Sequence, residues 1–111
     1  KVVISDTDKG IDIISEKHSI KLDDQGSAVK IVSGGTLEIT AGANKLSFTN
    51  SGLELAGSGG KLAIAAAGVE LSAQANMTVK ANANCDVQAN AMMNLKTSAI
   101  MNIQGTLVKI N

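Results

Sequence analysis

Few side chains of this chain could do chemistry, and their spacing brings no reactive group together. The chain has one histidine, His18, and one cysteine, Cys85. Glu16 lies close to His18 in sequence, but these two side chains do not complete a metal site. A Ser–His–Asp arrangement around His18 would also need a cleft that excludes water, which the repeat described next does not offer. We therefore expect no catalytic, cofactor-binding or metal-binding residue, and no enzymatic activity.

The dominant feature is an apolar–X–apolar triplet that recurs about every eight residues, fourteen times in 111 residues. The middle residues are polar except Val3 and Ala63. Alternation of this kind is the two-residue period of a strand with one buried face. A unit this short indicates a rod of stacked repeats rather than a globule with a pocket. The apolar pairs are Val2/Ile4, Ile11/Ile13, Ile20/Leu22, Val29/Ile31, Leu37/Ile39, Leu46/Phe48, Leu53/Leu55, Leu62/Ile64, Val69/Leu71, Met77/Val79, Cys85/Val87, Met93/Leu95, Met101/Ile103 and Val108/Ile110.

Glycine, asparagine, aspartate and serine lie between the triplets, and these residues tolerate sharp changes of chain direction. The starts of successive triplets are separated by 9, 9, 9, 8, 9, 7, 9 and 7 residues, and then by 8, 8, 8, 8 and 7. The pattern predicts strands of about five residues, a common strand length, each followed by a corner. We predict a single needle-like domain over residues 1–111, with less regular repeats in 1–68 and strict octads in 69–111.

The strict octads read MTVKANAN, CDVQANAM, MNLKTSAI and MNIQGTLV, and neighbouring octads have equivalent columns. A single-chain solenoid with three octads per turn predicts a superperiod near 24 residues, which is not seen. Three intertwined chains predict the observed equivalence, because each octad passes to the next of three identical faces. The predicted fold is all-β, an intertwined homotrimeric triangular β-prism (a triple-stranded β-helix) with an octad repeat.

In such a prism the consecutive strands of one chain lie on different faces. We therefore expect a lone chain to make almost no sheet hydrogen bonds, and the homotrimer to be obligate. One strand layer per repeat gives a rod of about 65 Å. The predicted trimer core consists of Ile11, Ile13, Ile20, Leu22, Val29, Ile31, Leu37, Ile39, Leu46, Phe48, Leu53, Leu55, Leu62, Ile64, Val69, Leu71, Met77, Val79, Cys85, Val87, Met93, Leu95, Met101 and Ile103.

Composition narrows the possible partners and the roles of His18 and Cys85. Ten lysines balance ten acidic residues, so we expect no nucleic-acid binding. No apolar run approaches the eighteen residues or so of a membrane-spanning helix. Cys85 occupies the same position in its triplet as Met77, Met93 and Met101 occupy in theirs, which indicates a small core side chain. His18 lies two residues before Ile20, so it would share the strand face of Ile20. We interpret it as a corner residue rather than as a metal or anion ligand repeated three times around the axis.

The closing octads, MNLKTSAIMNIQGTLVKIN, resemble the end of the triple-stranded β-helix of VgrG spike proteins. The run SIKLDDQGSAVKIVSGGTLEITAG resembles the segment that opens such needles, including those of contractile phage tails. The resemblance implies a non-enzymatic, envelope-puncturing needle of a type VI secretion system that contacts the target membrane mechanically. It implies synthesis in the bacterial cytoplasm and secretion through the apparatus. It also leads us to expect a fragment whose upstream domains, which dock on the tube protein, are missing.

The C-terminal run is the one predicted partner site. A strand that ends a rod has unpaired backbone groups and exposed aliphatic side chains, so a partner that covers it is favourable. The resemblance supplies a conical PAAR-repeat tip protein as that partner. The iron site of some phage needles is not expected, because His18 lies far from the C-terminus. The predicted tip-binding residues are Leu107, Val108, Lys109, Ile110 and Asn111.

Two other functions remain open from the sequence. A trimeric shaft of a phage fibre or surface adhesin would share the octads, but it should hold a globular head or a ligand-binding patch. A monomeric solenoid enzyme or binder is disfavoured by the missing superperiod and the absent catalytic cluster.

Overall fold

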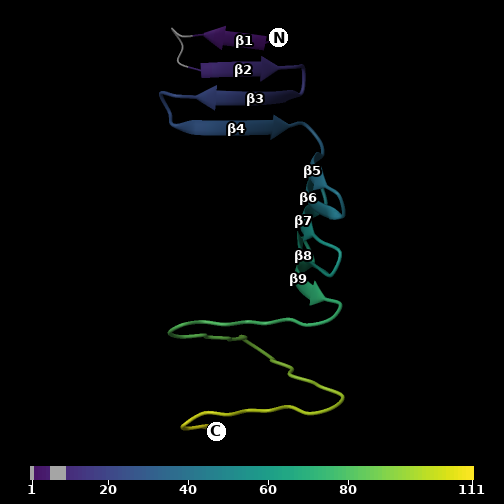
Figure 1. Ribbon diagram of the computed structural model, residues 1–111, viewed down its shortest axis with the longest axis vertical. Coiled ribbons are helices and arrows are strands. Elements are labelled where there is room, and N and C mark those ends of the chain that lie inside the picture. The colour runs from purple at the N-terminus through teal and green to yellow at the C-terminus, as the bar shows by residue number, and fades with distance from the viewer. Residues whose placement is uncertain (1, 6–9) are drawn as a thin grey trace. The chain divides into compact units, whose positions relative to one another are not determined.

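The computed structural model describes residues 2–5 and 10–111, with side chains described for Val2 and residues 10–111. Its regular structure is entirely β, and the described residues include no helix (Figure 1). The prediction of an all-β chain of short strands is confirmed. The strands are β1 (Val2–Ser5), β2 (Gly10–Ile14), β3 (His18–Asp23), β4 (Ala28–Ser33), β5 (Leu37–Ala41), β6 (Asn44–Thr49), β7 (Gly52–Ala56), β8 (Gly60–Ala65) and β9 (Gly68–Ala73).

The strands form two antiparallel meanders, in which each strand pairs with the one before it in the chain. Sheet A has the order β1-β2-β3-β4, and sheet B has the order β5-β6-β7-β8-β9. The expectation that a lone chain makes almost no sheet hydrogen bonds is therefore wrong for residues 2–73. The physical reason is local, since short loops return the chain beside the strand that it has just left.

Glycine permits the tight loops of sheet B. Residues 42–43, 50–51 and 66–67 form two-residue loops between paired strands. Gly42 has a φ of 59° at the first position of its loop, where type II′ hairpin turns place glycine. Gly52 follows the next loop with a φ of 150°, and a Cβ atom on it would clash with the backbone carbonyl oxygen of Ile64. A side chain at position 52 is therefore excluded both by φ and by space.

The four-residue turn between β3 and β4 is closed by an aspartate. The backbone N–H of Gly26 donates to Oδ1 of Asp23 over 2.9 Å, and Ser27 has a φ of 53°. The Gly26 hydrogen bond lowers the pKa of the exposed Asp23 carboxyl, and the charges of Lys21 and Lys30 act in the same direction. The ionised carboxylate thus supports this turn, and that support is lost as the pH falls through the lowered pKa.

The chain divides into two units, Lys1–Met77 and Thr78–Asn111. No strand is assigned in residues 74–111, all of which the structure describes. The backbone there bends at 74–75, 82–83, 90–91, 98–99 and 106, at the eight-residue spacing of the sequence octads. Figure 1 draws this part as a plain trace, green to yellow, with repeated changes of direction. The octad is therefore present in the backbone, but without strand partners.

Substitution of Gly52 tests the hairpin geometry. Gly52→Ala places a methyl group against the Ile64 carbonyl and forces alanine into a glycine conformation. We expect it to lower the free energy of unfolding by more than about 1 kcal/mol per chain. Gly59→Ala is the matched control, because a Cβ atom there has no neighbour within 4 Å. Thermal unfolding followed by circular dichroism at equal protein concentration measures both; an unchanged midpoint for Gly52→Ala contradicts the described hairpin.

Candidate functional site

The strand register of sheet B gathers ten apolar residues on one face. In one row Leu37 pairs with Phe48, which pairs with Leu53 in turn, and the row continues through β8 and β9. A second row lies two residues away along each strand. The two rows are Leu37, Phe48, Leu53, Ile64 and Val69, and Ile39, Leu46, Leu55, Leu62 and Leu71. We call this surface the apolar face of sheet B.

Nothing in the described chain covers this face. Leu55 is 54% exposed although it lies on the central strand of the five-stranded sheet, and Val69 on the edge strand β9 is 69% exposed. Among the described side chains no hydrophobic residue is buried, and the one buried polar residue is Ser47. A sheet with one apolar face is stable when a second layer covers that face. The exposed apolar surface therefore indicates oligomerisation.

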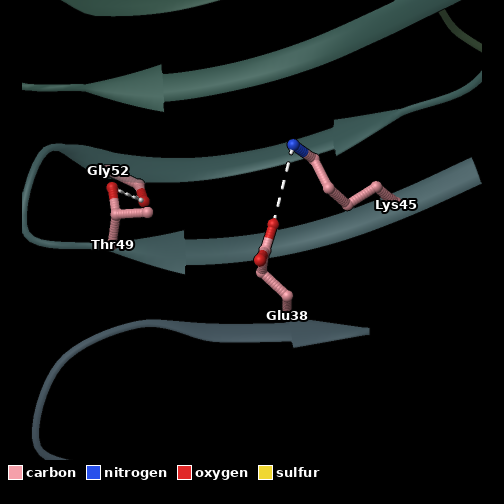
Figure 2. A network of polar contacts seen from close by, with 4 residues as sticks. All are labelled: Glu38, Lys45, Thr49 and Gly52. Atoms are coloured by element: carbon pink, nitrogen blue, oxygen red, sulfur yellow. Dashed lines mark hydrogen bonds and ion pairs between the residues drawn. The ribbon is translucent and has the colours of Figure 1, made fainter. Parts of the chain in front are cut away.

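The opposite face of sheet B is polar and carries charges in alternate strands. Glutamates lie on β5, β7 and β9, and lysines lie on β6 and β8. The Lys45 Nζ atom is 3.7 Å from Oε1 of Glu38, and Figure 2 shows this pair across neighbouring strands. Lys61 and Glu70 form a second pair at 3.9 Å. The four side chains are 40–65% exposed, so solvent screening leaves each pair about 0–1 kcal/mol.

Figure 2 also shows how the loop after β6 is held. The Thr49 hydroxyl donates to the Gly52 carbonyl oxygen over 3.4 Å, a contact that Figure 2 draws. The same hydroxyl accepts from the Ser51 N–H at 3.1 Å. The two polar side-chain contacts therefore stabilise the turn rather than form a binding site.

Sheet A has an apolar face of the same kind, and also apolar residues on its other face. Its register aligns Val2 and the predicted core residues Ile11, Ile13, Ile20, Leu22, Val29 and Ile31. Ile14 and Val32 lie on the opposite face with Ser19 between them, and are 42% and 56% exposed. The sequence reasoning missed this pair because it considered triplets alone. The doublets Ile13–Ile14 and Ile31–Val32 were the available signal.

The remaining predicted core residues lie in the segment without strands. Met77, Val79, Cys85, Val87, Met93, Leu95, Met101 and Ile103 are all exposed in the single chain. The five predicted tip-binding residues are exposed as well, with Leu107 at 82% and Ile110 at 85%. Assignment of these residues to a trimer core and to a tip site stays a prediction.

His18 has a local hydrogen-bonding role in the structure. Its Nδ1 atom accepts from the Gly34 N–H over 3.2 Å, and its carbonyl oxygen accepts from the Ser15 N–H over 2.9 Å. It lines an open groove of about 410 Å³ whose other side chains include Ile20 and Ile31. No three His, Cys, Asp or Glu side chains converge on a common point anywhere in the described chain. The contacts of His18 are those of a residue that closes a corner.

Comparison of the chain with known protein families, with curated proteins and with solved structures finds no match. The part of the chain that the structure describes has no helix with the length and hydrophobicity needed to cross a bilayer. The most extensive feature of the described residues is the continuous apolar face of sheet B, which is suited to packing against another apolar layer.

A charge on the apolar face should prevent assembly. Leu55→Glu places a carboxylate in the middle of the second apolar row, where a covering layer would have to bury it unpaired. We expect the oligomer to fall to a monomer of 11.3 kDa, measured by size-exclusion chromatography with light scattering. The control is Glu54→Gln, on the polar face one residue away, which should leave the oligomer unchanged. An oligomer of unaltered mass in Leu55→Glu contradicts this interface.

Proposed function

We propose that the chain is the needle of a spike that a contractile secretion system drives through the envelope of a target cell. In this proposal three copies pack their apolar faces around a common axis and form a triangular β-prism. Residues 74–111 of the three chains intertwine. The observation that supports the assembly is the uncovered apolar face of sheet B together with bends at octad spacing in residues 74–111.

The proposed role is mechanical. A closed prism has no lateral strand edges, so it resists bending and sideways aggregation. Its apolar residues lie inside, and the charged residues of sheet B lie outside, four of them in two Glu–Lys pairs. Such a rod transmits an axial force without a catalytic group, a cofactor or a bound metal. The target membrane is contacted by displacement rather than by a lipid-binding pocket.

The proposed partner site is the C-terminal end of the needle. Leu107, Val108 and Ile110 would end the prism with exposed aliphatic side chains and unpaired backbone groups. A conical tip protein of the PAAR-repeat type would cover this end and carry an effector. In this proposal the protein is made in the bacterial cytoplasm and leaves the cell through the apparatus. The resemblance of the closing octads to VgrG spikes favours this function over a fibre or adhesin shaft.

The reactivity of Cys85 tests the proposed prism. In the single chain Cys85 is exposed, whereas the prism places three copies of it around the axis. We expect the native protein to have a mass near three times 11.3 kDa and its thiol to react with Ellman's reagent at least tenfold more slowly than in denaturant.

The matched control is the pair Cys85→Ser and Asp86→Cys, which moves the thiol to the outward neighbour. That thiol should react rapidly in the native protein. A native monomer, or equal reactivity at the two positions, contradicts the prism.

Removal of the last four residues tests the partner site. A chain that ends at Leu107 should lose detectable binding to a cognate conical tip protein, because the aliphatic strand that contacts it is gone. Its mass should remain that of the trimer, since the apolar faces of both sheets are intact. Pull-down of the tip protein and light scattering measure the two properties. The point variant Lys96→Ser, outside the five predicted tip-binding residues, is the control, and full binding by the truncated trimer contradicts the docking site.

A further inference from the structure

The spacing between apolar triplets correlates with where the chain pairs with itself. Within residues 2–73, each spacing of seven or nine residues is spanned by a hairpin of sheet A or sheet B. The single spacing of eight in that region, from Val29 to Leu37, separates β4 from β5, which belong to different sheets. The spacings of eight resume after Val69, and no strand follows β9. The last spacing, from Met101 to Val108, is seven and is the one exception.

Parity of the loops explains this correlation. In every hairpin an even number of residues separates the last paired residues, as with Ala65 and Gly68, or Asp23 and Ala28. With an even loop, two apolar triplets oppose each other only if their starts differ by an odd number. A hairpin across 74–75 would instead place Leu71 opposite Thr78. A one-residue mismatch of this kind turns the apolar side chains of one strand toward water.

A loop with an odd number of residues would restore the match, but the sequence does not favour one. Three-residue hairpin loops usually close with a residue in the left-handed conformation, most often glycine. Sheet B has Gly42 at positive φ within one of its two-residue loops, and Gly52 and Gly68 at positive φ directly after the other two. Residues 69–104 contain no glycine. Between β9 and Met101 the chain therefore lacks both the spacing and the turn residue for a further hairpin.

We propose that each eight-residue spacing is a crossover to the neighbouring face of the prism, and that a second copy of this chain supplies the missing strand. The free edge of β9 pairs with residues 76–81 of another copy, and β4 pairs with β5 of another copy. The inference rests on the homotrimer of the proposed function and locates where pairing within the chain gives way to pairing between chains.

Length and parity support a second copy as the partner of β9. The strand β9 has six residues, and the segment 76–81 between two bends also has six. Val69 and Leu71 occupy the same octad positions as Met77 and Val79. Three chains related by a threefold axis wind in the same sense, so the paired strands run parallel. Octad n of one copy then lies beside octad n+1 of the next, with apolar residues aligned.

The charges agree with this arrangement. Parallel pairing of β4 with a neighbour's β5 places Lys30 beside Glu38, two opposite charges eight residues apart in sequence. In the later octads Lys80 lies beside Gln88 of the neighbour rather than beside Lys96. No like-charged pair is formed at these positions. A second copy is thus a complementary partner in charge as well as in shape.

Disulfide trapping in the full chain tests the crossover. In a Cys85→Ser background, the pair Glu70→Cys and Thr78→Cys puts one thiol on β9 and one on the proposed neighbouring strand. Adjacent strands lie about 4.8 Å apart, within the range of about 4.4–6.8 Å between Cα atoms that a disulfide spans. Oxidation should link 70 to 78 between copies and close a covalent trimer on a non-reducing gel. The control pair Ala63→Cys and Glu70→Cys faces across β8 and β9 of one chain and should give only monomers.

The result separates this inference from the proposed function. A covalent trimer from the 70/78 pair, with monomers from the 63/70 pair, supports the crossover. If light scattering gives a trimer but oxidation of the 70/78 pair gives only monomeric or unlinked chains, the crossover is overturned and the trimer remains. A monomer by light scattering overturns both. Covalent trimers from the 63/70 pair contradict the meander of sheet B itself.

Discussion

A single layer of strands cannot cover its own apolar face, and this constraint governs the rest of the structure. The two sheets satisfy most of their backbone hydrogen bonds within one chain, but the described chain buries no hydrophobic side chain. Full burial of a residue the size of leucine contributes roughly 1.5–3 kcal/mol. Because ten such residues line one face of sheet B, most of the available stabilisation appears only on assembly. In an oligomer that covers this face, folding and association would therefore be coupled.

Much of the local structure follows from the sequence. The triplets Leu46/Phe48 and Leu53/Leu55 predict short strands with one apolar face, and both lie on the apolar face of sheet B. Alternation along a strand sets which side chains share a face, so the members of this surface could be predicted residue by residue. The doublet Ile13–Ile14 escaped because alternation assigns its second residue to the polar face.

The neighbour of each strand was harder to predict. Alternation says nothing about whether a strand pairs with the preceding strand of its own chain or with a strand of another chain. That choice depends on loop length and turn residues, such as Gly42 between β5 and β6. The difference between spacings of seven or nine and spacings of eight held this information, but only the observed pairing shows how it is used. The partners of the C-terminal residues, such as Ile110, depend on surfaces outside this chain.

The division of the chain into paired and unpaired parts has a consequence for assembly. Hairpins join residues close in sequence, and such contacts form in microseconds at low entropic cost. The hairpins of sheets A and B can therefore begin to form before chains meet, and packing of their apolar faces in the proposed trimer would then stabilise them. Residues 74–111 have no such local partners, so in the proposed trimer they would acquire order last, starting from the edge of β9.

The alternating charges on the outer face of sheet B affect which strands can become neighbours. Glu38, Glu54 and Glu70 occupy one column, but Ser47 and Ala63 lie between them in the intervening strands. If the meander skipped a strand, two glutamates would become direct neighbours, and like charges at such positions are destabilising. The exposed Glu–Lys pairs add little to the free energy of unfolding. Their order along the sheet instead makes strand orders that place two of β5, β7 and β9 side by side electrostatically unfavourable, which removes some of the alternatives open to a very regular repeat.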